Sequence, residues 1–397
     1  MEQLRVLELY SGIGGMHYAL KESRVAAEVT AAIDVNTTAN EVYRHNFPET
    51  PLWAKTIEGL TLDHFNRLDF DMILMSPPCQ PFTRIGLQGD VSDPRTKSFL
   101  YILDILPRLA KRPRFLLLEN VKGFETSSAR DALVKTLKDC GYSYQEFLLS
   151  PTCLGIPNSR LRYFLIARAL PGSFSFLTTT EILEAFPDSA DPAPDPAPDP
   201  APSHAPGHAR GLSSSDEAGE GRVLYKMETA RDLESKRGQD ADESVRRIQE
   251  FLEEEEEEEE EGGVGRGMGQ YLLPQKTLLR YTLLMDIVRP TCRRSVCFTK
   301  GYGHYVEGTG SVLQSCTDAK VVETAFADLD TLTDEQKLQQ LSRLRLRYFS
   351  PREIANLMGF PSDFSFPEKT TLKQRYRVLG NSLNVHVVGR LIALMVG

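Results

Sequence analysis

The sequence has no apolar run close to twenty residues, the length that a membrane-spanning helix needs. Residues 1–5 show neither the basic nor the apolar region of a secretory leader, so we expect a reducing intracellular compartment. No two of the six cysteines form a CxxC pair, and the seven histidines do not fall at zinc-ligand spacing with them. We therefore expect free thiols, no metal and no membrane contact in this chain of 397 residues.

Acidic residues are abundant, but they are unevenly placed. The net charge is −9, yet residues 186–262 hold 23 Asp and Glu against 8 Lys and Arg, which leaves 32 acidic and 38 basic residues in the rest. Proline repeats from Pro187 onward and the run Glu253–Glu261 favour disorder, because like charges repel and little apolar surface offsets the chain entropy. A short amphipathic helix around Ser244 to Leu252 is compatible with the sequence inside this segment. The remainder is mildly basic, which permits contact with a phosphate backbone.

Apolar strand patterns alternate with helical ones in the first 170 residues. We expect strands at residues 4–9, 29–34, 54–58, 70–75, 114–118, 142–149 and 161–167. Continuous apolar runs are typical of parallel strands that are covered on both faces. The pattern predicts an α/β fold with a Rossmann-like doubly wound sheet, which binds its ligand at the carboxyl ends of the strands.

A glycine turn, Gly12-Ile13-Gly14-Gly15, follows the first strand. Its spacing differs from the G-x-G-x-x-G pattern that holds a pyrophosphate. Asp34 ends the second strand about twenty residues later, where dinucleotide-binding folds place a carboxylate on ribose hydroxyls. A ribose contact without a phosphate contact favours S-adenosylmethionine over a dinucleotide.

A cysteine stands between prolines at the end of another strand. Cys79 lies in Ser76-Pro77-Pro78-Cys79-Gln80-Pro81-Phe82-Thr83, and the prolines stiffen this turn and remove backbone donors. Glu119 ends the next apolar strand and is expected at the same crevice, and Arg160 and Arg162 alternate so that both side chains point to one face. The alternative for Cys79 is a buried structural thiol, and the alternative for the two arginines is a solvent-exposed basic edge of the sheet.

The most basic region runs from Gln270 to Lys300, with six basic residues against the single acid Asp286. Basic residues, aromatic side chains and glycines alternate in this region and just beyond it, as in proteins that bind single-stranded nucleic acid. An ordinary solvated surface is the alternative. The candidate substrate-binding residues are Arg289, Arg293, Arg294, Cys297, Phe298, Thr299 and Lys300.

The turn around Cys79, the triplets at Glu119 and Arg160, and Gly380-Asn381-Ser382 together resemble the ordered motifs of the cytosine C5 methyltransferases. The resemblance covers residues 4–168 and 350–395. Cys297-Phe298-Thr299 further resembles the branch of eukaryotic tRNA(Asp) cytosine-38 methyltransferases, which have the architecture of a DNA methyltransferase.

The resemblance implies a catalytic domain begun by residues 1–185 and completed by a C-terminal return at 348–397. It implies a disordered acidic linker at 186–268 and a target-recognition domain at 269–347. The expected partner is tRNA, tRNA(Asp) in particular, with weak binding of DNA, and the expected enzyme is a monomer in the cytoplasm and nucleus that makes 5-methylcytosine.

The same resemblance assigns catalytic roles. Cys79 would add to carbon 6 of cytosine, Glu119 would stabilise charge at ring N3, and Arg160 and Arg162 would hold the base's carbonyl oxygen and orient the thiolate. Thr56 departs from the family, whose DNA-acting members often have Asp there, and Tyr10 replaces a usual Phe. The cofactor contacts that it implies are Ile13, Gly14, Gly15, Asp34, Val35, Ile57, Glu58, Ser76, Asn381 and Ser382.

Three other functions are compatible with parts of the pattern. A DNA cytosine-5 methyltransferase shares the catalytic motifs, so these do not distinguish the substrates. A nucleic-acid-binding adaptor on a retired methyltransferase fold is disfavoured because Cys79, Glu119 and Arg162 are all present. An NAD-dependent oxidoreductase explains Asp34 but not the cysteine turn.

Overall fold

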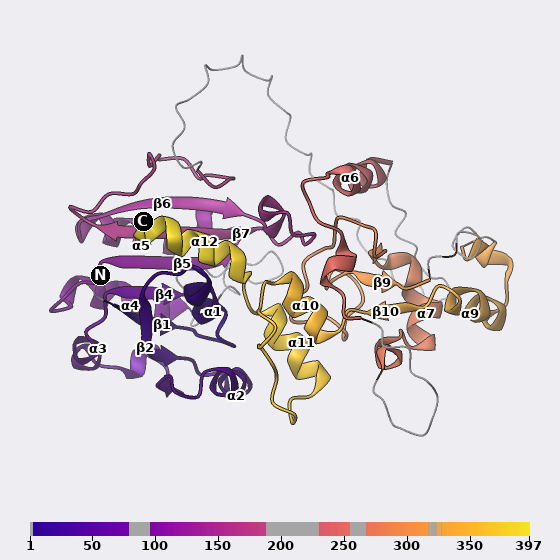
Figure 1. Ribbon diagram of the computed structural model, residues 1–397, viewed down its shortest axis with the longest axis horizontal. Coiled ribbons are helices and arrows are strands. Elements are labelled where there is room, and N and C mark those ends of the chain that lie inside the picture. Colours follow the sequence, from indigo (N-terminus) through magenta and orange to yellow (C-terminus); the bar gives the residue numbers. More distant parts are fainter. Residues whose placement is uncertain are drawn as a thin grey trace, which may run out of the picture.

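The structure is a computed structural model that describes residues 3–78, 96–187, 230–254, 267–316, 318, 324–326 and 328–397 (Figure 1). Cys79, the expected nucleophile, lies outside the described residues, as does most of the proline-rich and glutamate-rich sequence.

A seven-stranded sheet forms the larger part of the molecule, with strand order β3-β2-β1-β4-β5-β7-β6. Strand β7 is antiparallel to both β5 and β6, and the other neighbouring pairs are parallel. The strands are β1 (Leu4–Leu9), β2 (Ala27–Ile33), β3 (Leu52–Trp53), β4 (Met72–Met75), β5 (Phe115–Val121), β6 (Tyr142–Leu149) and β7 (Arg162–Ala169). The strand order reverses between β1 and β4, which is where such a sheet binds its ligand.

The predicted Rossmann-like fold is therefore confirmed, with one local error. A strand was expected at residues 54–58, but β3 ends at Trp53, and Ile57–Gly59 forms a single 3-10 turn.

Helices cover both faces of this sheet, and each face has its own apolar core. One core contains side chains of α1 and α2 together with the C-terminal helices, and the other contains side chains of α3, α4 and α5. The helices are α1 (Gly15–Glu22), α2 (Thr37–Asn46), α3 (Leu62–Leu68), α4 (Lys97–Ile105) and α5 (Ser128–Asp139).

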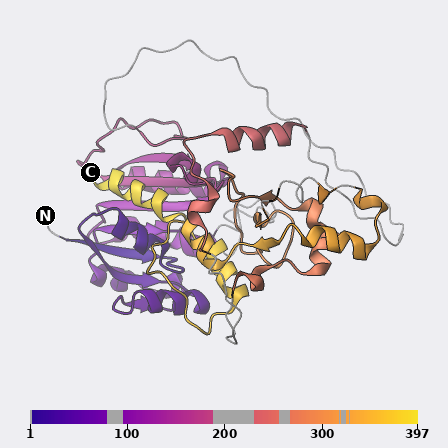
Figure 2. The ribbon, with the colours of Figure 1, turned by 45° about the vertical axis from the view of Figure 1, so that its right-hand side comes forward.

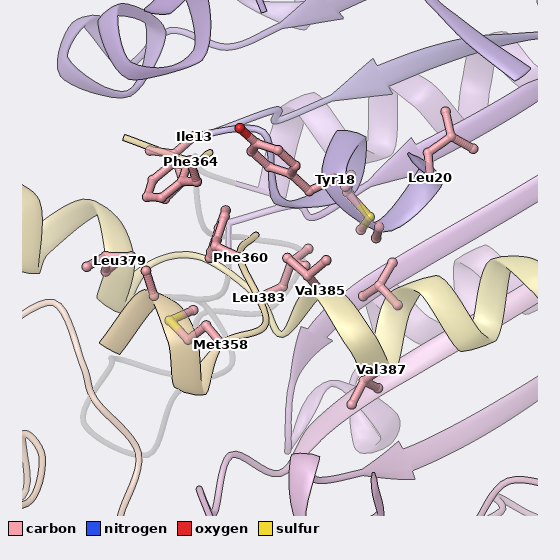
Figure 3. Close-up of a cluster of buried hydrophobic side chains, with 14 of the residues drawn as sticks. Ile13, Tyr18, Leu20, Met358, Phe360, Phe364, Leu379, Leu383, Val385 and Val387 are labelled. Atoms are coloured by element: carbon pink, nitrogen blue, oxygen red, sulfur yellow. The ribbon is translucent and has the colours of Figure 1, made fainter. Parts of the chain in front are cut away.

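The C-terminal return consists of α10 (Pro351–Leu357), α11 (Leu372–Gly380) and α12 (Val385–Val396). Ser350 begins α10 with a capping box, since its side chain accepts the Glu353 N–H and Glu353 reaches back to the Ser350 N–H. Helix α12 packs against α1, and Figure 3 shows side chains from both helices in one cluster. The stretch Leu372–Val396 is apolar and long enough to span a membrane, but 61% of its most apolar window is buried inside the protein.

A smaller sheet of β8 (Ile287–Val288), β9 (Val312–Gln314) and β10 (Leu346–Tyr348) lies beyond the return, with α7 (Gln275–Tyr281) and α9 (Asp334–Ser342) (Figure 1). We call this part the recognition unit. Its small core includes Leu278, Met285, Leu341 and Leu344.

Residues 230–254, which we call the strap, cross from the recognition unit to the large domain. They contain α6 (Ala230–Ala241), which lies along the recognition unit (Figure 2), and a turn at Ile248–Phe251. The Ile248 N–H donates to the Cys292 carbonyl at 2.8 Å, and Asn356 Nδ2 donates to the Phe251 carbonyl at 3.0 Å. The prediction of disorder across 186–268 is therefore wrong for the strap, because Val245, Ile248 and Phe251 supply buried apolar surface.

Candidate active site

A cavity of about 370 Å³ opens at the carboxyl ends of β1, β2, β4 and β5. Residues 10–13, 15, 16, 34–36, 39, 76–78, 119, 121, 160, 162, 378 and 380–383 line it. The structure thus brings together the glycine turn, the second-strand acid, the start of the cysteine turn, Glu119, both arginines and the C-terminal motif. This is the crevice that the topology predicts for a ligand.

The glycine turn is closely packed on its outer side. Gly14 caps α1 with φ at 87°, and a Cβ on it would lie 2.4 Å from the Phe47 ring. A Cβ on Gly15 would lie 3.0 Å from Ser382 Oγ. The C-terminal return therefore closes the cavity directly against the turn.

Asp34 is fixed by two backbone donors. Its carboxylate accepts the Gly12 N–H at 2.9 Å and the Asn36 N–H at 2.7 Å. Burial raises the pKa of Asp34 against the effect of these hydrogen bonds. The adjacent Val35 side chain is 61% exposed, and the buried Ser11 Oγ has no partner among the described residues.

These groups fit S-adenosylmethionine. A carboxylate held by backbone donors suits ribose hydroxyls, an exposed apolar side chain next to it suits the adenine ring, and an unsatisfied hydroxyl in the cavity wall suits a polar ligand atom. Ile57 and Glu58 do not line the cavity, so their contact with adenine stays a prediction.

The start of the cysteine turn is held from two sides. Ser76 Oγ donates to the Tyr10 carbonyl at 3.2 Å, and Asn120 Nδ2 donates to the Pro77 carbonyl at 3.3 Å. Sequence reasoning gave Asn120 and Tyr10 no such part. Tyr10 also has a positive φ of 56°, and its hydroxyl donates to Ser98 Oγ at 2.9 Å, neither of which a sequence pattern shows.

Glu119 and Arg162 face each other in the cavity, with Arg162 Nε 3.6 Å from Glu119 Oε1. Burial raises the pKa of Glu119, although the guanidinium groups of Arg162 and Arg160 oppose this change. A carboxyl group with a raised pKa can keep its proton and share it with a ring nitrogen. The geometry therefore allows the role that the resemblance gives to Glu119.

Arg160 joins three segments of the chain. It is 4% exposed. Its Nη1 donates to Cys297 Sγ at 3.2 Å and to the Phe298 carbonyl at 3.0 Å, and its Nη2 donates to the Gly380 carbonyl at 3.1 Å and to the Ser382 carbonyl. Both terminal nitrogens of Arg160 are thus bonded to protein and hold these segments together, while the residue also lines the cavity, so its contact with the carbonyl oxygen of a base stays a prediction.

Cys297 lies behind the cavity wall, between the two arginines. Arg162 Nη2 is 3.7 Å from Cys297 Sγ. Burial alone would raise the pKa of this thiol, but the nearby Arg160 and Arg162 outweigh burial and lower it. Phe298 is only 2% exposed and packs edge-on against Tyr302, so it is a core residue and not the substrate contact that was expected.

The basic candidates divide into two pairs. Arg294 is buried, with Nη1 2.7 Å from Asp286 Oδ1, and the Arg293 N–H donates to Asp240 of the strap at 2.8 Å. Arg294 therefore acts within the protein and not at its surface, which corrects its expected role. Arg289 and Lys300 are exposed and stay candidates for phosphate contacts. Thr299 is half-buried, and its N–H donates to the Thr309 carbonyl.

Comparison with known proteins gives consistent matches over the whole chain. A profile of the family "C-5 cytosine-specific DNA methylase" matches residues 4–396. The tRNA (cytosine(38)-C(5))-methyltransferase of Bos taurus is 58% identical over 400 residues, covering 100% of both chains. A Dictyostelium discoideum protein named DNA (cytosine-5)-methyltransferase is 38% identical and covers 100% of this chain and 95% of its own.

A solved structure also superposes over the full length. The crystal structure of a Spodoptera frugiperda DNMT2 mutant matches with a TM-score of 0.76 and 37% identity, covering 100% of both chains. The match includes the recognition unit and the return as well as the large sheet. The chain therefore belongs to the C-5 cytosine-specific DNA methylase family, as its motifs predicted, and with it to the methyltransferases that use S-adenosylmethionine.

Proposed function

We propose that this protein transfers a methyl group from S-adenosylmethionine to carbon 5 of cytosine 38 in the anticodon loop of tRNA(Asp). The observation that carries the proposal is the single cavity that joins Asp34 and the glycine turn to Glu119 and Arg162. The substrate is supported by the 58% identity with a relative named for this reaction.

The reaction needs a nucleophile because carbon 5 of cytosine is too electron-poor to attack a methyl group unaided. The Cys79 thiolate would form a bond to carbon 6, moving the ring electrons to carbon 5. Glu119 would share its proton with N3, and Arg162, beside Glu119, would hold the carbonyl oxygen of the base. Methyl transfer would leave the cofactor as a neutral thioether. A base such as water would then take the proton from carbon 5, the C5–C6 double bond would reform, and Cys79 would leave as a thiolate.

The chain's own residues would also hold the cofactor. Asp34 would bind the ribose, Val35 would cover the adenine, and Gly15 and Ser382 would form the wall around the methionine part. The cofactor supplies an electrophilic methyl group on a sulfonium. Glu119 and Arg162 reach the same cavity from β5 and β7, so one bound base and one bound cofactor would meet there.

DNA is the second candidate substrate, because the Dictyostelium relative carries that name. An anticodon loop already exposes its bases, whereas a duplex must first release one from the stack. We propose RNA as the main substrate and weak activity at most on DNA. We also propose a monomeric enzyme present in the cytoplasm and the nucleus, which size-exclusion with light scattering and a fluorescent fusion would test.

Methyl transfer from labelled S-adenosylmethionine tests the proposal. Wild type and Cys79→Ala are compared on tRNA(Asp), on tRNA(Asp) with cytosine 38 replaced by uridine, and on duplex DNA. We expect label on intact tRNA(Asp) alone, and none with Cys79→Ala. Label mainly on DNA, or label on the uridine-38 tRNA, would contradict the proposed substrate.

A further inference from the structure

We propose that His304 and Tyr305 form a stacking platform for an unpaired RNA base next to the target cytosine. The platform rests on the proposed function, because it assumes that a single-stranded loop of RNA lies at the cavity. It gives a specific role to an exposed aromatic pair that neither catalysis nor the protein core uses.

Tyr305 is more exposed than any other Tyr, Phe or Trp in the part of the chain that the structure describes, at 64%. His304 beside it is also exposed. The two rings meet edge to face, with centroids 4.6 Å apart and an interplanar angle of 67°. A flat group that covers these rings would remove their apolar surface from water, which is favourable.

The loop that carries the pair is fixed in place. The N–H groups of His304 and Tyr305 donate to the Gly301 carbonyl at 3.0 and 2.9 Å, and Thr309 Oγ1 donates to the Tyr305 carbonyl at 2.7 Å. Gly303 has a φ of 73°, and a Cβ on it would lie 2.9 Å from the Tyr376 ring of α11. A rigid aromatic surface loses little entropy when a base stacks on it.

This loop continues directly from the wall of the cavity. A Cβ on Gly380, which lines the cavity, would lie 2.2 Å from the Thr299 carbonyl carbon and 2.3 Å from the Lys300 nitrogen. A Cβ on Gly301 would lie 3.0 Å from the Tyr305 ring. The loop that carries the aromatic pair therefore begins against a residue that lines the cavity.

The charges around the loop suit a nucleic acid. Lys300 is exposed at the start of the loop, and α11, against which the loop packs, carries exposed Lys373 and Arg377. Glu307 is the single acid among residues 300–310. A base stacked on the pair would bring its phosphates close to these cations, which is the combination that single-strand binders use. Because every base has an aromatic face, the platform would accept any unpaired neighbour.

Tyr305→Ala tests the platform, with Tyr305→Phe as the conservative variant. The matched control is Tyr281→Ala, since Tyr281 is also an exposed tyrosine of the recognition unit, at 37%, but lies on α7. We expect Tyr305→Ala to raise KM for tRNA(Asp) by about 5- to 150-fold, with kcat at saturating tRNA and the melting temperature unchanged. Tyr305→Phe and Tyr281→Ala should behave like wild type.

A second readout follows stacking itself. An RNA hairpin with 2-aminopurine next to cytosine 38 should lose fluorescence on binding to wild type and to Tyr305→Phe, but not on binding to Tyr305→Ala. Wild type that methylates tRNA(Asp), with an unchanged KM in Tyr305→Ala, overturns the platform alone. Wild type that methylates only DNA overturns the platform together with the proposed function. Loss of tRNA binding in Tyr305→Phe would assign the effect to the hydroxyl group and also overturn stacking.

Discussion

The large sheet and the recognition unit are stabilised in different ways. The central strands β1, β4 and β5 bury almost entirely apolar side chains between two helical layers. The recognition unit has a three-stranded sheet of two or three residues per strand and contains buried charge pairs. Arg294–Asp286 lies within it, and Arg347–Glu353 connects it to the return. Helices of the N-terminal part and of the return cover the large sheet with two extensive apolar cores, whereas the recognition unit has a small core and is also bonded to the strap and the return. The active site lies where the two meet.

Glu8 is a buried acid within the otherwise apolar sheet, and its replacement is expected to have the largest effect on stability among the substitutions considered. It is fully buried, accepts the Tyr43 hydroxyl at 2.7 Å, and burial raises its pKa from 4.5 to about 8. Above pH 4.5 the folded protein keeps a proton on Glu8 that the unfolded chain releases. The contribution of Glu8 to stability is therefore complete below pH 4.5 and is lost as the pH rises to about 8. The free energy of unfolding of wild type should fall by about 5 kcal/mol between pH 4.5 and about 8, and Glu8→Gln should not show this decrease.

Chemical denaturation of wild type and Glu8→Gln at several pH values measures the difference. The two stability curves should diverge most above pH 8. Parallel curves would show that Glu8 is not a protonated acid in the folded protein.

The buried pair Arg347–Glu353 should be the most sensitive charge pair tested. The side chains are 3% and 0% exposed, and their nearest atoms are 2.7 Å apart. Arg347→Met leaves Glu353 without its cationic partner, which should cost about 3 to 5 kcal/mol in unfolding free energy. The control is Lys135→Met on α5, whose partner Asp139 is 61% exposed and whose loss should cost less than about 1 kcal/mol. Equal costs would remove the distinction between the two regions.

Gly380→Ala tests the junction between the return and the recognition unit, where Gly380 packs against Thr299 and Lys300. The new methyl group would meet the backbone of Thr299 and Lys300, which cannot rotate away, so we expect a loss of about 1 to 3 kcal/mol and a large loss of activity. Gly238→Ala on α6 is the control, because a Cβ there meets nothing within 4 Å, and it should be neutral or slightly stabilising. A Gly380→Ala variant with wild-type activity and stability would show that these two backbone segments can move apart without effect, which would contradict the account.

The two arginines should differ in what they affect. Arg160→Lys loses the guanidinium group that donates to both the Phe298 and the Gly380 carbonyl. It should lower the free energy of unfolding by about 1 to 2 kcal/mol and lower activity as well. Arg162→Lys should lower kcat while the melting temperature stays near that of wild type. Thermal melting beside steady-state kinetics separates the two, and an unchanged melting temperature in Arg160→Lys would contradict its joining role.

The parts predicted from sequence are those fixed by local pattern. Asp34 and Glu119 could be placed because Asp34 directly follows β2 and Glu119 lies near the end of β5, and the carboxyl ends of such strands meet at one crevice. The role of Arg160 could not be predicted, since its partners Cys297 and Gly380 are 137 and 220 residues away in sequence. The order of the strap was predicted only in part. A short amphipathic helix was compatible with residues 244–252, where the structure has a 3-10 turn at Ile248–Phe251, but helix α6 was missed because its sequence has little apolar surface.

Covalent trapping tests the central claim most directly. A hairpin RNA with the tRNA(Asp) anticodon-loop sequence and 5-fluorocytosine at position 38 is incubated with the protein and S-adenosylmethionine, because fluorine at carbon 5 blocks the final elimination. The account predicts a denaturation-resistant adduct in which the RNA is attached to Cys79, absent from Cys79→Ala and from a hairpin with uridine at position 38. No adduct with this RNA, alongside a Cys79 adduct on duplex DNA containing 5-fluorocytosine, would contradict it.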